Sequence, residues 1–412
     1  MAQLNITLNQ DEILQLLGND RDEAFRTLLQ NSLNNILKAE SAEQLKAAPY
    51  QRTKERTDSR NGTRERTLLT RIGNIELQVP RHRNQPFKTM VFDNYSRSEA
   101  ALIASMAEMV VNGVSTRKVS RVMETLCGTA YSKSAVSEVC KEMDSDVEEF
   151  RQRPLTEPYP FLLIDATYFK VRENHRVISK AFMVAYGISG QGKQEILGFG
   201  VYHSESKETW HDFLQGLKDR GLKGLLMITS DAHEGIRDAI TRVFPDVPWQ
   251  RCQFHFSKNI ADKTPKRYQS ALRAELQEMY RSHTIEEARQ KRDAIIREYQ
   301  DVAESAMTCL DEGFESAMTV INLSSRLRLR LRTSNALERV NRELKRRSRV
   351  IGVFPNEASV QRLMGAVLTE IHQQWQEAMG IFGTKSYALM MQSDLPARMV
   401  KIAREQRALM AA

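Results

Sequence analysis

Three carboxylates in this chain have the residue types and the surroundings of metal ligands. Asp165 and Asp231 each follow a short uncharged run, Phe161–Ile164 and Leu225–Ile228, typical of a buried strand that ends on an acid at the edge of a sheet. Glu338 lies in a predicted helix rich in Arg and Lys. Three acids in a basic setting suit divalent metal ions and a phosphodiester better than a small neutral substrate.

One Asp after an apolar run is more often a helix cap or a turn residue, so the hypothesis rests on the three acids together. Two Mg²⁺ or Mn²⁺ ions, which prefer oxygen ligands, would fit such a set. Asp165 would bridge both ions, and Asp231 and Glu338 would each complete one. Such a pair of ions activates a water or a 3′-hydroxyl and stabilises the departing oxygen.

The order of the predicted elements indicates an α/β fold around these acids. Three strands come first, followed by a helix over 207–219, a strand at 224–229, a helix over 234–243 and a strand near 249–253. This is the order of a ribonuclease-H-like core, a mixed sheet flanked by helices, with Asp165 on the central strand and Asp231 on the fourth. The long stretch before Glu338 predicts an inserted all-helical subdomain.

Composition shifts along the chain suggest six regions. They are an N-terminal helical segment (1–46), a basic arm with short strands (47–95), a helix-turn-helix-like DNA-binding domain (96–150), the first part of the core (158–256), the helical insertion (257–325), and the completion of the core with C-terminal helices (326–412). The part before the core is therefore expected to be a mainly helical DNA-binding region.

Positive charge is gathered into two blocks, which indicates contact with a polyanion. Residues 326–349 hold ten Lys and Arg against two acids, and residues 51–90 hold ten against four, in a chain of net charge +8. Each phosphate that a cation neutralises releases counterions and adds affinity. A solvated, solubilising face is the alternative for either block taken alone. The alternating RLRLRLR run at 326–332 predicts a strand with leucines inward and arginines toward phosphate.

Two predicted helices, 116–126 and 133–144, resemble a helix-turn-helix, with Ser115 and Ser132 as caps. Their connector is longer than usual, and any small helical bundle looks similar. The side chains expected to contact DNA come from these helices and from the second basic block. They are Arg117, Lys118, Lys133, Ser134, Arg332, Asn335, Arg339, Arg342, Lys345, Arg346 and Arg347.

Four further residues near the acids have open roles. Cys252 and His255 have the Cys-x-x-His spacing of one half of a zinc site, but no second ligand pair is evident. This favours a structural or positioning role over metal binding. His233 could approach a scissile phosphate, although a histidine there more often bonds the backbone. Trp210 lies on an amphipathic helix and is expected in the core, with stacking on a flipped base as the minor alternative.

Global properties favour a protein of the cytoplasm. Hydrophobic residues make up 41% and charged residues 27% of the 412 residues, as in soluble globular proteins. The four scattered cysteines do not suggest a disulfide framework, and neither a signal peptide nor a membrane span is recognisable.

The chain resembles bacterial insertion-sequence transposases of the Mutator superfamily. The resemblance is carried by LLIDATYFKVR, ETWHDFLQGLKDRGLKGLLMITSDAHEGI, WQRCQFHFSKN and TSNALERVNRELKRRSRVIGVFPNEASVQRL, with TLLTRIGNIELQVPRHR and NGVSTRKVSRVMETLCG upstream. It implies a DDE-type core with Asp165, Asp231 and Glu338 as the metal-binding triad and a helical insertion before the third acid. It also implies the Cys-x-x-His element at Cys252 and His255, and a circular double-stranded intermediate.

The function expected from this resemblance is that of a transposase that binds terminal inverted repeats and joins cut 3′ ends to target DNA, as a dimer or larger assembly near the nucleoid. A regulator derived from a transposase, binding DNA without catalysis, is the alternative, and its mark would be the loss of a triad acid. A purely hydrolytic nuclease would leave the helix-turn-helix and the basic arm unexplained.

Overall fold

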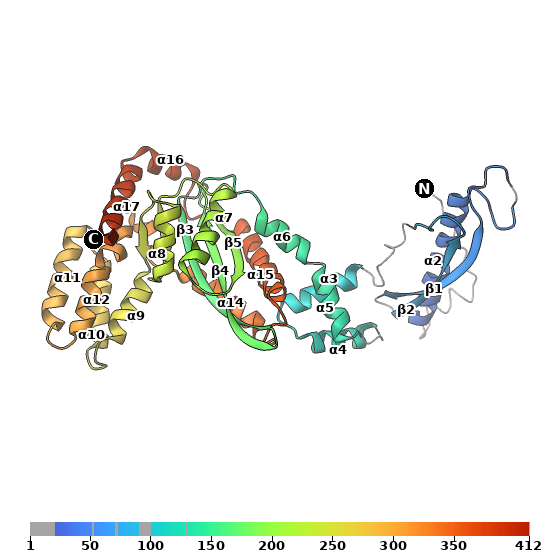
Figure 1. Cartoon of the computed structure of the whole chain (residues 1–412), viewed down its shortest axis with the longest axis horizontal. Helices are drawn as coiled ribbons and strands as arrows, with labels where there is room; N and C mark the ends of the chain where they lie inside the picture. Colours follow the sequence, from blue (N-terminus) through green and yellow to red (C-terminus); the bar gives the residue numbers. More distant parts are fainter. Residues whose placement is uncertain (1–20, 52, 71–72, 90–99, 128–130, 412) are drawn as a thin grey trace. The chain divides into compact units, whose positions relative to one another are not determined.

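The computed structural model describes residues 21–51, 53–70, 73–89, 100–127 and 131–411. The chain divides into two compact units at Glu142 and Met143 (Figure 1). The helix α6 (Asp144–Gln152), which we expected in the DNA-binding domain ending at 150, belongs to the second unit, where it packs on α15 (Glu357–Glu377). Among the described helices, none combines the length and the apolar character needed to cross a bilayer.

The first unit begins with a helix that covers a two-stranded ribbon. The helix α2 (Arg21–Leu45) packs on β2 (Gly73–His82), which pairs antiparallel with β1 (Arg60–Thr70). Short strands were expected in the basic arm, and residues 60–70 and 73–82 form them; β2 continues past Pro80. Proline is tolerated because this ribbon has free edges and its register shifts nearby. Residues 1–20 of the expected N-terminal helical segment lie outside the described residues.

Three short helices follow in the same unit. They are α3 (Ala100–Val111), α4 (Thr116–Cys127) and α5 (Lys133–Lys141). Met106, Val119 and Val136, one from each helix, are fully buried in their shared core. Ser132 caps α5 as expected, because its hydroxyl accepts a hydrogen bond from the backbone N–H of Ala135 at 3.0 Å.

The second unit is built on a five-stranded mixed sheet. Its strands are β3 (Phe161–Glu173), β4 (Arg176–Ile188), β5 (Gln194–Tyr202), β6 (Met227–Ser230) and β7 (Trp249–Arg251), and their spatial order is β5-β4-β3-β6-β7. The first three strands form an antiparallel meander, whereas β6 and β7 run parallel to β3. The central strand β3 is therefore the junction between the two halves of the sheet.

Helices cover both faces of this sheet. On one face, α7 (Lys207–Asp219) and α8 (Glu234–Val243) pack on alternate residues such as Leu162 and Ile164. On the other face, α15 packs on β5, and Trp375 of α15 meets the ring of Tyr186 edge-on, with ring centroids 5.1 Å apart. This layered arrangement confirms a mixed α/β fold (Figure 1).

A helical block separates β7 from the helix that carries Glu338. It comprises α9 (Gln253–Asp262), α10 (Gln269–Tyr280), α11 (Ile285–Tyr299) and α12 (Glu304–Ala317), followed by η1 (Thr319–Asn322). Its core, centred on the fully buried Phe256 and Phe314, is distinct from the core under the sheet, although both lie in one compact unit. The remaining helices are α13 (Ser325–Leu331), α14 (Asn335–Ser348), α16 (Thr384–Gln392) and α17 (Leu395–Ala411).

The strand predicted at 326–332 is wrong, because this run forms α13. Arg and Leu are strong helix formers, so an alternating Leu/Arg pattern does not exclude a helix. Leu327 and Leu331, four residues apart, share one helical face, and Leu331 is fully buried. Leu329 projects elsewhere and is 66% exposed.

Two helical glycines provide a test of the packing between α15 and the sheet. A Cβ on Gly365 would lie 2.4 Å from Val147 Cγ1 and 2.9 Å from Phe199 Cε2, whereas a Cβ on Gly216 of α7 would meet nothing within 4 Å. We expect Gly216→Ala to raise the thermal unfolding midpoint by about 2–4 °C through helix propensity. Gly365→Ala should lower the midpoint, because overpacking costs more than that gain. Equal rises in both variants would contradict this packing.

Candidate active site

The parallel pairing of β3 and β6 brings Asp165 and Asp231 together. Leu163 pairs with Thr229, so the same register continued by two residues sets Asp165 level with Asp231. Asp231 directly follows β6, as expected for an acid at the end of a strand. Asp165 does not end its strand, because β3 continues to Glu173 in a hairpin with β4 that extends beyond the short β6. The expected strand end at Asp165 is therefore wrong, although its place beside Asp231 fits.

The pKa of Asp165 records this proximity. Burial and the charge of Asp231 raise the pKa of Asp165 to about 7, even though the Ala166 N–H donates to its Oδ1 at 2.9 Å. Asp231 accepts a hydrogen bond from the backbone N–H of His233 at 3.3 Å. Two neighbouring carboxylates that resist being charged together are a donor set that a divalent cation relieves.

Helix α14 presents Glu338 to the same strand. The side-chain amide of Asn341 donates a hydrogen bond to Asp165 Oδ2 at 2.8 Å, which joins α14 to β3. Glu338 precedes Asn341 by three residues and therefore shares its helical face. The Oε1 atom of Glu338 is buried and forms no hydrogen bond with any residue that the structure describes. The sequence analysis missed Asn341, and its spacing from Glu338 was the signal that could have found it.

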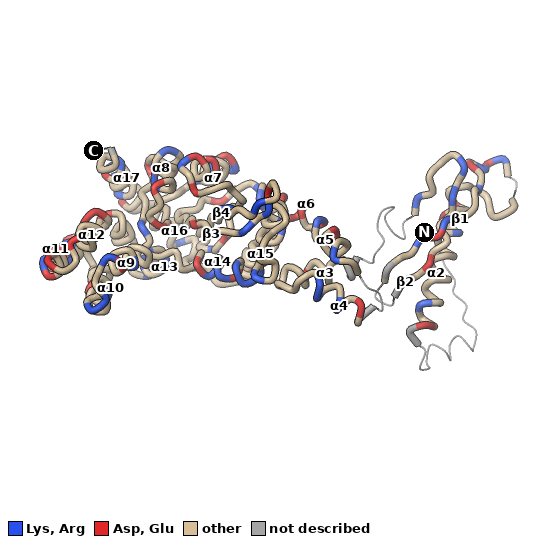
Figure 2. The backbone as a smooth tube through the Cα atoms, turned by 60° about the horizontal axis from the view of Figure 1, so that its bottom comes forward, with Lys and Arg blue, Asp and Glu red and all other residues tan. Residues whose placement is uncertain are grey.

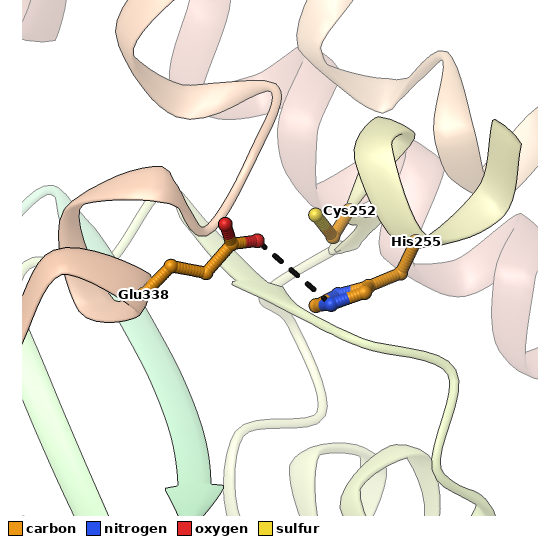
Figure 3. Close-up of side chains that lie close together, drawn as sticks. All are labelled: Cys252, His255 and Glu338. Atoms are coloured by element: carbon orange, nitrogen blue, oxygen red, sulfur yellow. Dashed lines mark ion pairs between the residues drawn. The ribbon is translucent and has the colours of Figure 1, made fainter. Parts of the chain in front are cut away.

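The Cys-x-x-His pair converges on Glu338 (Figure 3). His255 Nε2 lies 3.8 Å from Glu338 Oε1, and the ligand atoms of Cys252, His255 and Glu338 all lie within 4.8 Å of one another. The spacing of Cys252 and His255 suggested half of a metal site, and the structure places a carboxylate from a distant helix as the third donor. Such donors can hold zinc, so this geometry keeps the metal alternative open.

Hydrogen bonds nevertheless link Cys252 to the polypeptide on both sides of the site. Its backbone N–H donates to the carbonyl of Ser230 at 2.7 Å, just before Asp231. Its Sγ accepts from the N–H and the hydroxyl of Ser334, at 3.3 and 3.4 Å, just before α14. Cys252 therefore connects the end of β6 to the start of the Glu338 helix, which supports a positioning role.

The pKa values of Cys252 and His255 are shifted by each other and by the residues around them. The Cys252 thiol raises the pKa of His255 to about 9, and the Asp165 and Glu338 carboxylates add to the effect against the cost of burial. Burial raises the pKa of Cys252, but interactions with His255 and Ser334 outweigh it, so the net change is a decrease. An imidazolium at His255 therefore balances part of the negative charge of the site.

The Arg and Lys side chains of α14 that were expected to contact DNA differ in their exposure and in their ion pairs. Lys and Arg positions of α14 are blue in Figure 2. Three of these side chains are exposed and form no ion pair with a described residue: Arg339, Arg342 and Lys345. Arg346 pairs with Glu343 at 2.7 Å but is 59% exposed. Arg347 is only 6% exposed and pairs with Glu343 and Glu370. The expectation that Arg347 contacts DNA is therefore corrected, because its charge is buried and paired within the fold.

The remaining expected residues lie as follows. Trp210 is fully buried in the core under α7, which confirms its core assignment and removes it as a stacking residue. His233 precedes α8, and its buried Nδ1 bonds to no described residue, so the expected backbone bond from its side chain is absent. Arg332 is half-buried and Asn335 exposed at the start of α14. Four exposed side chains lie on α4 and α5: Arg117, Lys118, Lys133 and Ser134.

Comparison with known proteins identifies close relatives. The family model "Transposase, Mutator family" matches residues 1–378. The chain is 40% identical over 391 residues to the transposase for insertion sequence element IS256 in transposon Tn4001 of Staphylococcus aureus, covering 94% of this chain and 99% of that protein. It is 39% identical to the transposase for ISRM5 of Rhizobium meliloti (86% and 89% covered) and 35% identical to that for IS1081 of Mycobacterium tuberculosis (93% and 95% covered).

The link between Cys252 and Ser334 can be tested with a double-mutant cycle. Cys252→Ala leaves the buried N–H and hydroxyl of Ser334 without their acceptor, which should cost about 1–3 kcal/mol and lower the unfolding midpoint. The same substitution should cost clearly less in a Ser334→Ala background, since one of the two donors is gone. Elemental analysis accompanies the cycle, because stoichiometric zinc that disappears in Cys252→Ala would assign the thiol to a metal site instead.

Proposed function

The chain belongs to the Mutator family of transposases, and we propose that it is a DDE-type enzyme that cleaves the ends of its own insertion sequence and transfers them to target DNA. The proposal is supported by the register that sets Asp165 level with Asp231 and by the Asn341 hydrogen bond that attaches the helix of Glu338 to the strand of Asp165. The strand order β5-β4-β3-β6-β7 supports a ribonuclease-H-like core, because Asp165 lies on β3 and Asp231 directly follows the adjacent parallel strand β6.

The three acids are the residues that would hold Mg²⁺ or Mn²⁺, and their chemistry fits hard divalent cations. The raised pKa of Asp165 and the unbonded Oε1 of Glu338 are the marks of that fit. When bound, such ions activate the attacking oxygen and stabilise the departing one. Asn341 orients Asp165, and Cys252 with Ser334 sets the start of the helix that carries Glu338.

The basic side chains would position DNA over these acids. Arg339, Arg342 and Lys345 project from α14, the helix of Glu338, and would contact phosphates rather than bases. In the first unit, Lys133 and Ser134 lie in the first turn of α5, the place from which a recognition helix reads bases. We propose that α4 and α5 read the terminal inverted repeats, and that two or more copies hold both ends together.

A regulator without catalysis is the second reading, and it is not favoured. Its mark would be the loss of a triad acid, whereas all three acids are present, and both aspartates accept hydrogen bonds. We propose that the protein acts on DNA in the bacterial cytoplasm.

Neutralising the triad tests the proposed function. Asp165→Asn, Asp231→Asn and Glu338→Gln should each abolish Mg²⁺-dependent nicking and strand joining of a labelled duplex that carries the element's terminal repeat, with end binding retained. Asp212→Asn on α7 is the matched control, because that side chain is 75% exposed and its ion-pair partner is the neighbouring His211. Cleavage that persists in a variant removes its acid from the site, and binding without cleavage by the unaltered chain would favour the regulator.

The orienting role of Asn341 gives a separate prediction. Asn341→Ala removes a hydrogen bond to a carboxylate, and such bonds contribute about 1.5–3 kcal/mol, so the cleavage rate should fall by roughly 10- to 100-fold. End binding should change little, whereas the unfolding midpoint should fall, because the same hydrogen bond attaches α14 to β3. Asn322→Ala, which removes an amide bonded to the carbonyl of Thr319, should leave the rate unchanged. An unaffected rate in Asn341→Ala would exclude the role.

A further inference from the structure

A pocket of about 590 Å³ lies beside the candidate active site, between the helical block and the start of α14. Its walls come from α9, from α10 with the following turn, and from the segment that joins α13 to α14. The volume is in the range of sites that enclose a small ligand. It adjoins the acids because Phe254, which lines it, packs edge-on against His255 with ring centroids 5.4 Å apart.

Phe254 is unusual for an aromatic residue next to a catalytic centre, because half of it is exposed. Its neighbours Cys252 and Phe256 in the same turn of chain are buried, so the local fold has ample apolar contact without it. An exposed aromatic face offers a surface on which another flat ring can stack. Trp210, the aromatic that the sequence suggested for this purpose, is enclosed in the core.

The charge of the pocket indicates a polyanionic ligand. Lys258, Arg273 and Arg332 line it and form no ion pair with any described residue, whereas Arg281 pairs with Glu278. Asp262 is the one acid that lines the pocket. Three uncompensated cations around one aromatic ring match a nucleotide, which combines phosphate charge with a flat base.

Gln253 also lines the pocket, but its side-chain amide is buried within the fold. Gln253 is 3% exposed, and its amide nitrogen donates to the carbonyl of Ala317 at 2.8 Å. Its Oε1 accepts no hydrogen bond from any described residue, although buried amide oxygens are normally bonded. Because that oxygen is buried, it offers no contact to a ligand, and the exposed ring and the cations of the pocket are the groups that a ligand can meet.

We propose that this pocket receives one unpaired nucleotide next to the scissile phosphate, stacked on Phe254 and held through its phosphates by Lys258, Arg273 and Arg332. The inference rests on the proposed function and adds a step to it. Base pairs in a stacked duplex expose only their edges, so a base reaches the Phe254 ring only after it leaves the stack. The pocket thus couples local opening of the DNA to placement of the phosphate near Glu338.

The test is a double-mutant cycle that combines a substitution of Phe254 with the removal of one base at a time near the cut. Equilibrium binding of the full chain to the terminal-repeat duplex is measured in EDTA, where no cleavage occurs, with a single abasic site moved through the positions around the cut. Phe254→Ala should weaken binding to the intact duplex by about 5- to 150-fold, the range for one stacked base. At one position the abasic site should abolish that difference, and at the others the difference should remain.

Matched variants separate stacking from general apolar contact and from charge. Phe254→Trp should restore binding and Phe254→Leu should not, whereas removal of another exposed apolar side chain, in Leu329→Ala, should have no effect. Arg273→Gln should lower the slope of log affinity against log salt by about 0.7–0.9, and Arg242→Gln, whose partner is Asp238, should not.

The outcomes distinguish this inference from the function on which it rests. A Phe254→Ala deficit of equal size at every abasic position, or tight binding by Phe254→Leu, overturns the pocket even when the unaltered chain cleaves DNA normally. Position-specific coupling in EDTA supports the pocket whether or not cleavage is later observed. Failure of the unaltered chain to bind the terminal repeat overturns both.

Discussion

The hydrogen bond between Asn341 and Asp165 joins parts of the chain that are far apart in sequence, and the candidate site depends on it. Asp165 lies on the central strand of the sheet, whereas Glu338 lies on α14, beyond the whole helical block. With α14 attached to β3 at Asn341, the preceding helical turn brings Glu338 to the same strand. Cys252 provides a second attachment through Ser334. Two polar contacts thus define the position of one helix relative to the sheet.

This arrangement explains how a large helical block can interrupt the core without separating its acids. The backbone N–H of Gln253 donates to the carbonyl of Arg332 at 2.9 Å, and the Thr229 hydroxyl donates to the carbonyl of Leu331 at 3.1 Å. The chain therefore returns to the sheet close to where it left. The block packs on its own apolar core, so its length does not perturb the sheet. Its first two helices instead add a basic, aromatic wall beside the acids.

Charge is organised in two layers around the site. The inner layer holds the acids proposed as the triad, Asp165, Asp231 and Glu338; burial and the charge of Asp231 raise the pKa of Asp165, and His255 Nε2 lies 3.8 Å from Glu338 Oε1. Outside it lie the cations of α14 and of the pocket, most of them without an ion-pair partner among the described residues. An inner acidic and an outer basic layer suit a metal-dependent reaction on a polyanion, because each layer attracts a different component of the reaction.

The amino-acid sequence by itself determined most element types, the mixed α/β class and the family, and it singled out the three acids as candidates, because strand and helix periodicity and the family motifs are local properties. It did not determine the partners of those acids. Asn341, the third donor beside Cys252 and His255, the burial of Arg347 and the exposure of Phe254 all depend on contacts between residues distant in the chain. The run at 326–332 was misassigned for the same reason, since its alternating pattern fits either element and only packing of Leu331 selects the helix. Local pattern specifies each element, whereas tertiary packing decides which side chains meet.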